Sequence, residues 1–277
     1  MNSINNQTDH KNPSVIHNLT ELHLPENTKC LRILWMYPST LSIHGGRGDI
    51  MALLRFATLA KLPVEIRRID RLTDHIPLDE ADMLYFCAGD LTCMPDVIKA
   101  LKPREADFKA FAAQGKVIVA NGSTGAILAK DLWLLDDTLI HGLGLLGMHW
   151  VQRKTVHGDD LWMDVLQGIE VIGNEIKLAD VTLEPEQLPF GRVRYGGGNH
   201  GDGFEGAVTN NVIYTSCLGP VLVRNPALAM ELLRRGAEAA GITVSPEQFK
   251  VSPEEMLHEN EGLAQARTFI EKKMQKQ

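Results

Sequence analysis

Runs of apolar residues alternate with amphipathic stretches over the first 130 residues. Continuous apolar runs at 31–37, 81–89 and 116–120 predict strands that are buried on both faces of a sheet. The stretch 63–70 alternates apolar with polar residues, which is typical of a strand near a sheet edge. Helical periodicity at 49–61 and 95–115 separates these strands, with a break near Pro103 and an end at Gly115. Strands that alternate with helices predict βαβ units and a mostly parallel sheet.

The second half of the chain is less regular and rich in glycine. The segments 142–154, 168–183, 191–208 and 211–220 predict short strands joined by glycine-rich turns. A helix is predicted over 225–241, where Ala229, Leu232, Leu233 and Gly236 share one face. In the first half, Asp49 is the predicted N-cap of the helix that starts the 49–61 stretch.

The chain predicts one globular domain with two tails. Residues 1–30 are polar and predict a flexible N-terminal arm, whereas the first strand-like run begins at Leu31. The domain is expected to span 31–244. Residues 245–277 are highly charged and predict a solvated, helical C-terminal tail.

Composition and residue spacing argue against several classes of function. The net charge of −7 argues against nucleic-acid binding, which usually leaves a basic footprint. No apolar run is long enough for a membrane span, and the first 20 residues lack the apolar core of a secretory signal. The four cysteines form no Cys-x-x-Cys pair, and the histidines show no metal-ligand spacing. We therefore expect a cytoplasmic protein with no metal site.

Three glycine-containing turns follow the predicted parallel strands, at 44–49, 87–90 and 121–125. Ligands of open parallel sheets bind at the carboxyl ends of the strands, so these turns should meet at one site. None has the spacing of a dinucleotide or phosphate loop, and we expect no cofactor. The third turn reads NGSTG and has the layout of a nucleophile elbow, with Asn121 at its apex. An amide cannot be activated as a nucleophile, and Ser123 is interpreted as a helix-capping residue.

Several motifs, in the same order along the chain, resemble class I glutamine amidotransferase domains of the cobyric acid synthase-like type. Among these, the chain is most similar to glutaminase subunits of lipid II isoglutaminyl synthases, which act with a Mur-ligase-like partner. The resemblance covers residues 31–241 and rests on LSIHGGRGDIMALLRFA (41–57), GLGLLG (142–147) and YGGGNHGDGFEGAVTNNVIYTSCLGPVLVRNPALA (195–229). It implies a three-layer, flavodoxin-like α/β fold with a mostly parallel sheet.

In that family a cysteine at the elbow attacks the side-chain amide of glutamine, and a histidine at the end of the last strand supports proton transfer. Here Asn121 stands at the elbow, followed by Gly122 and Ser123, and Leu218 stands where the histidine would be. The glycine-rich oxyanion turn is reduced to Cys87-Ala88-Gly89. The resemblance therefore implies a vestigial amidotransferase site in which both catalytic residues are replaced.

Three hypotheses follow. The first is a non-catalytic, amidotransferase-like subunit that binds a Mur-ligase-like or other ATP-dependent synthetase, as a cytoplasmic heterodimer in cell-wall synthesis. The second is a binding module for a small amide or amino acid, in which Gly89, Gly122 and Ser123 line the old glutamine pocket and Asn121 contributes its amide. The third is an active amidotransferase with a relocated nucleophile, for which Cys87 and Cys217 are the candidates. Asn199 and His200, in a glycine-dense turn, are further candidate site residues.

Overall fold

The computed structural model describes residues 15–166, 168–250, 252 and 254–276. At its centre lies a seven-stranded sheet in the order β1-β3-β2-β4-β5-β13-β12. Strands β3, β2, β4, β5 and β13 are parallel neighbours, whereas β1 and β12 pair antiparallel at the two edges. The predicted mostly parallel sheet is confirmed. The strands are β1 Val15–His17, β2 Leu31–Met36, β3 Val64–Ile69, β4 Met83–Phe86, β5 Val117–Asn121, β12 Ala207–Thr209 and β13 Val212–Thr215.

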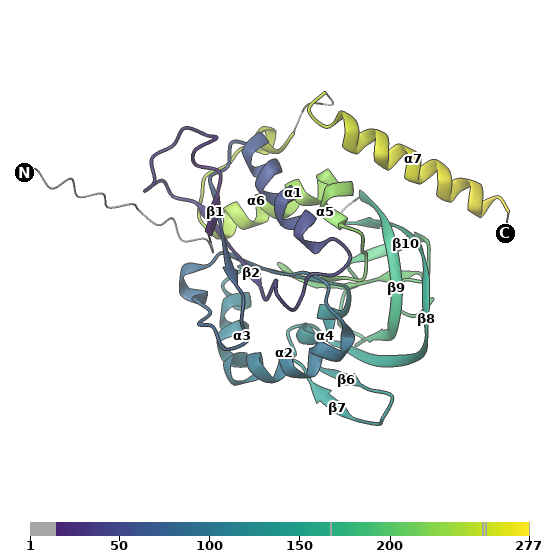
Figure 1. Ribbon diagram of the computed structural model, residues 1–277. Coiled ribbons are helices and arrows are strands. Elements are labelled where there is room, and N and C mark those ends of the chain that lie inside the picture. The colour runs from purple at the N-terminus through teal and green to yellow at the C-terminus, as the bar shows by residue number, and fades with distance from the viewer. Residues whose placement is uncertain (1–14, 167, 251, 253, 277) are drawn as a thin grey trace, which may run out of the picture.

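Helices cover both faces of this sheet and give it three layers (Figure 1). The side chains of β2 alternate between the two cores: Ile33 and Trp35 join one, and Leu34 and Met36 join the other. Burial on both faces explains why the strands read as continuous apolar runs. One face carries α1 Gly46–Leu59, α5 Val221–Arg224 and α6 Pro226–Ala239, and the other carries α2 Met94–Leu101, α3 Glu105–Ala113 and α4 Gly125–Leu128.

The predicted helices are present, with one change at α1. This helix begins at Gly46, so Asp49 lies in its first turn and is not the N-cap. The Asp49 carboxylate instead accepts a hydrogen bond from Leu222 N on α5 (2.7 Å). The predicted break near Pro103 is a short 3-10 helix, Lys102–Arg104, between α2 and α3, and Gly115 ends that segment with a φ of 77°. The remaining 3-10 helices are Leu78–Glu80, Leu91–Cys93, Gly122–Thr124 and Pro246–Phe249.

The second half forms another sheet beside the first. Its main feature is a long antiparallel ribbon of β8 and β9, which are 18 and 15 residues long. The prediction of short strands was wrong here, because Gly158 and Gly173 lie inside extended strands and not in turns. The bounds are β6 Asp131–Trp133, β7 Leu139–His141, β8 Met148–Val165, β9 Ile169–Leu183, β10 Gly191–Tyr195 and β11 Phe204–Glu205.

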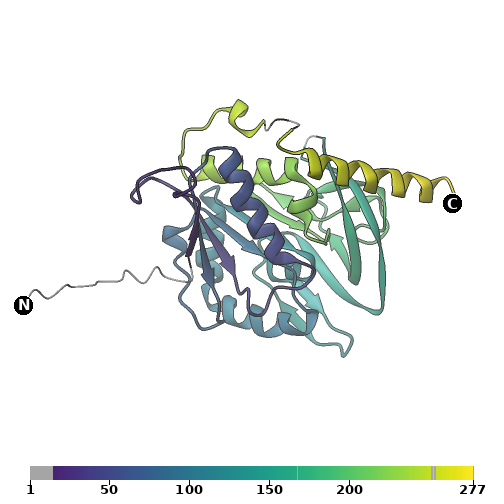
Figure 2. The same ribbon diagram turned by 45° about the horizontal axis from the view of Figure 1, so that its top comes forward.

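The N-terminal tail differs from the expectation, whereas the helix predicted in the C-terminal tail is present. Residues 15–17 of the predicted arm form β1 and pair with β3, and the buried Asn18 accepts from Val64 N (2.8 Å) and donates to Leu62 O (2.9 Å). The predicted boundary at residue 30 thus lies within the folded part, while 1–14 lie outside the described residues. The C-terminal helix, α7 Leu257–Met274, runs across the β8–β9 ribbon (Figure 2), where Ile270 is buried with Trp162 and Ile172. No helix in the described part of the chain has the length and apolarity that crossing a membrane requires.

Candidate functional site

The turn after β5 has its sharp point at Gly122. Asn121 keeps an ordinary extended backbone, with φ −116° and ψ 135°, whereas Gly122 has a φ of 60°. A strand-to-helix elbow strains the residue that holds its side chain above the sheet, and the left-handed region admits glycine without penalty. Thr124 closes the turn because its Oγ1 accepts from Asn121 N (3.1 Å). The apex of the turn is therefore Gly122, one residue after the predicted Asn121.

Asn121 does not offer its amide to a ligand. Its side-chain Nδ2 donates to Cys217 O (2.8 Å), and the residue is 3% exposed. The amide thus ties the end of β5 to the loop after β13. This contact satisfies a buried donor that would otherwise carry a desolvation cost.

Gly122 faces Leu218 in the turn after β13. A Cβ placed on Gly122 would lie 2.8 Å from Leu218 Cδ2 and 3.0 Å from Ala88 Cβ. The three predicted turns, which follow β2, β4 and β5, therefore meet at the carboxyl edge of the sheet, and the turn after β13 joins them there. The space that a nucleophile would occupy is filled by an aliphatic side chain.

Ser123 joins the elbow to the turn after β4. Its hydroxyl donates to Gly89 O, and Gly89 N donates back to Ser123 Oγ (3.3 Å). The serine is thus held by both backbone groups of Gly89 and does not cap the helix. Both hydrogen bonds of this hydroxyl go to backbone groups, and no side-chain base among the described residues is hydrogen-bonded to it.

Strand β9 lies over the site from the second sheet. Leu218 N donates to Asn174 O (2.7 Å), and Asn174 N donates to Leu218 O (3.2 Å). The close approach depends on Gly173, because a Cβ there would lie 2.3 Å from Cys217 Sγ. The ribbon is therefore hydrogen-bonded directly to Leu218, the residue that faces Gly122.

The remaining cavity is small. It has a volume of about 30 Å³ and lies between the turns at 44, 88–89, 122–123 and 216–218 and the strands β8 and β9. A site for one water needs about 10–15 Å³ on this measure, so the cavity holds roughly two waters. Trp150, which is 3% exposed, and Lys177, whose side chain is 10% exposed, contribute to its wall together with His44. Sequence reasoning placed the turn that begins at His44 at this site but missed Trp150 and Lys177.

Neither candidate cysteine is placed to react. Cys87 and Cys217 are fully buried, and burial raises the pKa of both thiols above the usual range. Cys87 Sγ lies 3.3 Å from Gly46 O, and neither cysteine lines the cavity. A thiol attacks as its thiolate, which these surroundings disfavour.

The glycine-dense turn after β10 is held by internal contacts. Asn199 lines the cavity, but its side chain is engaged with Gly206, accepting from N (2.8 Å) and donating to O (3.0 Å). His200 does not line the cavity and lies 3.3 Å from the carboxylate of Asp202.

A buried glutamate, which the sequence analysis did not identify, lies beside the end of β13. Glu205 accepts from Ser216 N (2.5 Å) and Thr215 Oγ1 (3.1 Å). Its complete burial raises its pKa to about 7. This carboxyl anchors the end of β13, the strand that leads to Leu218.

Comparison with known proteins relates the chain to glutamine amidotransferases. It is similar to subunit GatD of the glutamine-hydrolyzing lipid II isoglutaminyl synthase of Staphylococcus aureus (strain N315). The two are 24% identical over 225 residues, which span 79% of this chain and 89% of GatD. The chain matches no family profile.

A solved structure with a TM-score of 0.50 shares the architecture. The structure of PurLQS from Thermotoga maritima has a TM-score of 0.50 at 13% identity, over 77% of this chain and 96% of that chain. A crystal structure of a glutamine amidotransferase has a TM-score of 0.49 at 16% identity, over 75% and 98%. The predicted three-layer α/β fold of the flavodoxin-like, amidotransferase type is confirmed.

Proposed function

We propose that this chain is a non-catalytic, glutamine amidotransferase-like subunit. The observation that carries the proposal is the elbow, where Gly122 occupies the apex and faces Leu218. Hydrolysis of glutamine by this fold needs a thiolate at the elbow and an adjacent base to transfer protons. Glycine and leucine supply neither, and Asn121 would not supply them if the apex lay one residue earlier.

The partner we propose is an ATP-dependent synthetase of the Mur-ligase-like type. The similarity to GatD, which is a subunit of a synthase, supports a role within a two-component complex. In this role the chain contributes structure or regulation to a cytoplasmic heterodimer in cell-wall synthesis. The alternative hypothesis, a binding module for a small amide, has no support from the cavity beside the elbow. Its volume of about 30 Å³ is far below that of typical ligand pockets.

A glutaminase assay tests this function. Ammonia and glutamate release are measured for the purified chain, alone and co-expressed with a Mur-ligase-like synthetase from the same organism. We expect no turnover above the buffer rate in either case. Turnover that disappears in Cys87→Ala or Cys217→Ala, but persists in the matched control Cys93→Ala, would refute the proposal and favour a relocated nucleophile.

A further inference from the structure

Strand β7 is a free edge of the second sheet. The sheet ends at β7 in the order β11-β10-β8-β6-β7 within the described residues. Gly142 N donates to Lys130 O and Leu134 N donates to Thr138 O, so the backbone groups of every second residue face β6. By this alternation, Leu139 and His141 direct their N–H and C=O groups away from the sheet. An exposed edge of this kind is a template for another strand.

An apolar groove with a cationic rim lies along one face of this edge. Its walls are Leu139, Ile140 and His141 from β7, with Pro95, Ile98, Lys99, Lys102 and Pro103 from the α2 region. The volume is about 500 Å³. Lys102 is paired with Glu105 (2.7 Å), whereas Lys99 makes no ion pair with the described residues. No acidic side chain lines the groove, so an acidic ligand would meet Lys99 there without competition from a lining carboxylate.

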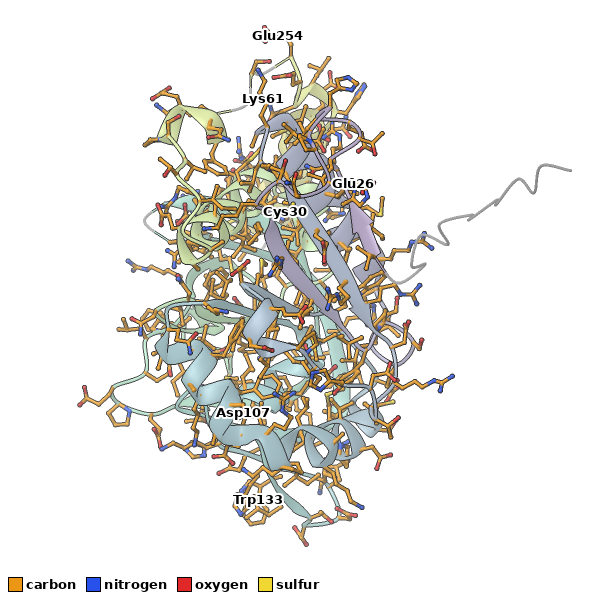
Figure 3. All side chains as sticks on the ribbon, turned by 90° about the vertical axis from the view of Figure 1, so that its left-hand side faces the viewer. Glu26, Cys30, Lys61, Asp107, Trp133 and Glu254 are labelled. Carbon is orange, nitrogen blue, oxygen red and sulfur yellow. The ribbon has the colours of Figure 1, made fainter. Side chains whose placement is uncertain are left out.

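The opposite face of the same edge carries an exposed apolar row. Leu139, Trp133 and Val151 are direct cross-strand neighbours on β7, β6 and β8. They are 39%, 43% and 49% exposed. Figure 3 shows Trp133 at the end of the molecule opposite Glu254, beyond the helix that carries Asp107. Large apolar side chains gathered on a sheet face mark interaction surfaces more often than isolated ones do.

We propose that β7 binds an extended, acidic segment of a partner protein by strand addition. The segment pairs with the outward backbone groups of Leu139 and His141. Its alternate side chains then point to opposite faces of the sheet. Acidic side chains on one face meet Lys99 and Lys102 in the groove, and apolar side chains on the other face extend the row that ends at Leu139.

A second copy of this chain fits the edge less well. Antiparallel pairing of two β7 strands about Ile140 sets Leu139 of one copy opposite His141 of the other. The apolar row of each copy then runs into the row of His141, Asp131 and His149. Each groove would also receive a strand flanked by another copy of Lys99, which makes no ion pair with the described residues. A partner strand that alternates acidic and apolar side chains matches both faces: its acidic side chains meet the lysines of the groove, and its apolar side chains extend the row that ends at Leu139.

This inference deepens the proposed function by naming where a partner subunit binds and what chemistry it presents. It rests on that function only for the identity of the partner. The two can fail separately, because strand addition at β7 involves no residue of the elbow. Glutaminase activity would remove the non-catalytic proposal and leave the strand site untouched.

The test uses the full chain and a fluorescein-labelled peptide of alternating glutamate and aliphatic residues, Ac-Glu-Val-Glu-Ile-Glu-Val-Glu-NH2. Fluorescence anisotropy is expected to show saturable binding below ~1 mM. Lys99→Glu is expected to weaken binding at least about tenfold, because it reverses the unpaired charge of the groove. The charge-matched control Lys272→Glu, on exposed α7, should leave binding unchanged.

A backbone variant separates strand addition from simple charge attraction. His141→Pro removes an N–H that faces away from β6, so the sheet is expected to keep its circular dichroism spectrum while peptide binding is lost. Equal binding by His141→Pro and the unaltered chain would overturn the proposal, as would no saturable binding. Light scattering should show a monomer, and a dimer that His141→Pro dissociates would assign the edge to a second copy instead.

Discussion

Replacing Gly122 with alanine tests the geometry of the elbow. A side chain at its φ of 60° costs about 1–2 kcal/mol, because an L-residue is strained in the left-handed region. The new Cβ would also lie 2.8 Å from Leu218 Cδ2 and 3.0 Å from Ala88 Cβ, and such overpacking costs a further ~1–3 kcal/mol. We expect Gly122→Ala to lower the free energy of unfolding by about 2–5 kcal/mol.

Gly115 offers a matched control. Its φ is 77°, and a Cβ there would meet no atom within 4 Å. Gly115→Ala therefore carries the backbone strain without the clash, and its expected cost is about 1–2 kcal/mol. The difference between the two alanine variants isolates the contact at the elbow.

A double-mutant cycle assigns this contact to its partner. Leu218→Ala alone removes buried methyl groups and is expected to cost about 2–5 kcal/mol. Adding Gly122→Ala to that variant should cost less than it does in the unaltered chain, with a coupling of ~1 kcal/mol or more. Urea unfolding followed by circular dichroism measures all four proteins. Additivity within ~0.3 kcal/mol, or equal costs for Gly122→Ala and Gly115→Ala, would refute the inferred geometry.

Two further predictions concern the surroundings of the site. Burial raises the pKa of Asp49 and of Glu205 to about 7, above 3.8 and 4.5 in the unfolded chain. At a pH between the unfolded and the folded pKa, each carboxyl is protonated in the native state and ionised in the unfolded state. Both groups therefore make the free energy of unfolding fall as pH rises from about 4 to about 7. Asp49→Asn and Glu205→Gln should each flatten this slope in urea titrations across that range, and an unchanged slope in both would contradict the assignment. Gly173→Ala places a Cβ 2.3 Å from Cys217 Sγ and should cost ~2 kcal/mol or more, whereas Gly158→Ala, whose Cβ would lie 3.6 Å from Glu175 O, should cost little by the same unfolding assay. Equal losses would show that β9 is not held against the last strand.

The meeting of the three turns was predictable because it follows from the sheet. Parallel strands that alternate with helices bring their carboxyl ends to one edge. Gly89, Gly122 and Ser123 follow strands that the apolar pattern marks clearly, whereas Leu218 was assigned to this edge by the family resemblance. These residues therefore come together in the structure as the sequence indicated.

The details that depend on backbone conformation and on the second sheet could not be predicted in this way. Asn121 and Gly122 both fit the apex of a turn, and only the φ angles identify Gly122. Lys177 and Trp150 reach the cavity because the long β8–β9 ribbon lies over the elbow. Local periodicity does not encode that packing, and glycines inside the ribbon resemble turn residues in the sequence.

Covalent labelling by a glutamine analogue tests the central claim most directly. A diazoketone analogue of glutamine alkylates the activated thiolate of glutaminases and leaves buried, protonated thiols unmodified. Intact-mass spectrometry of the native chain after incubation with this analogue is expected to show the unmodified mass alone. A stoichiometric adduct that peptide mapping places on Cys87 or Cys217 would contradict the account and establish a working nucleophile.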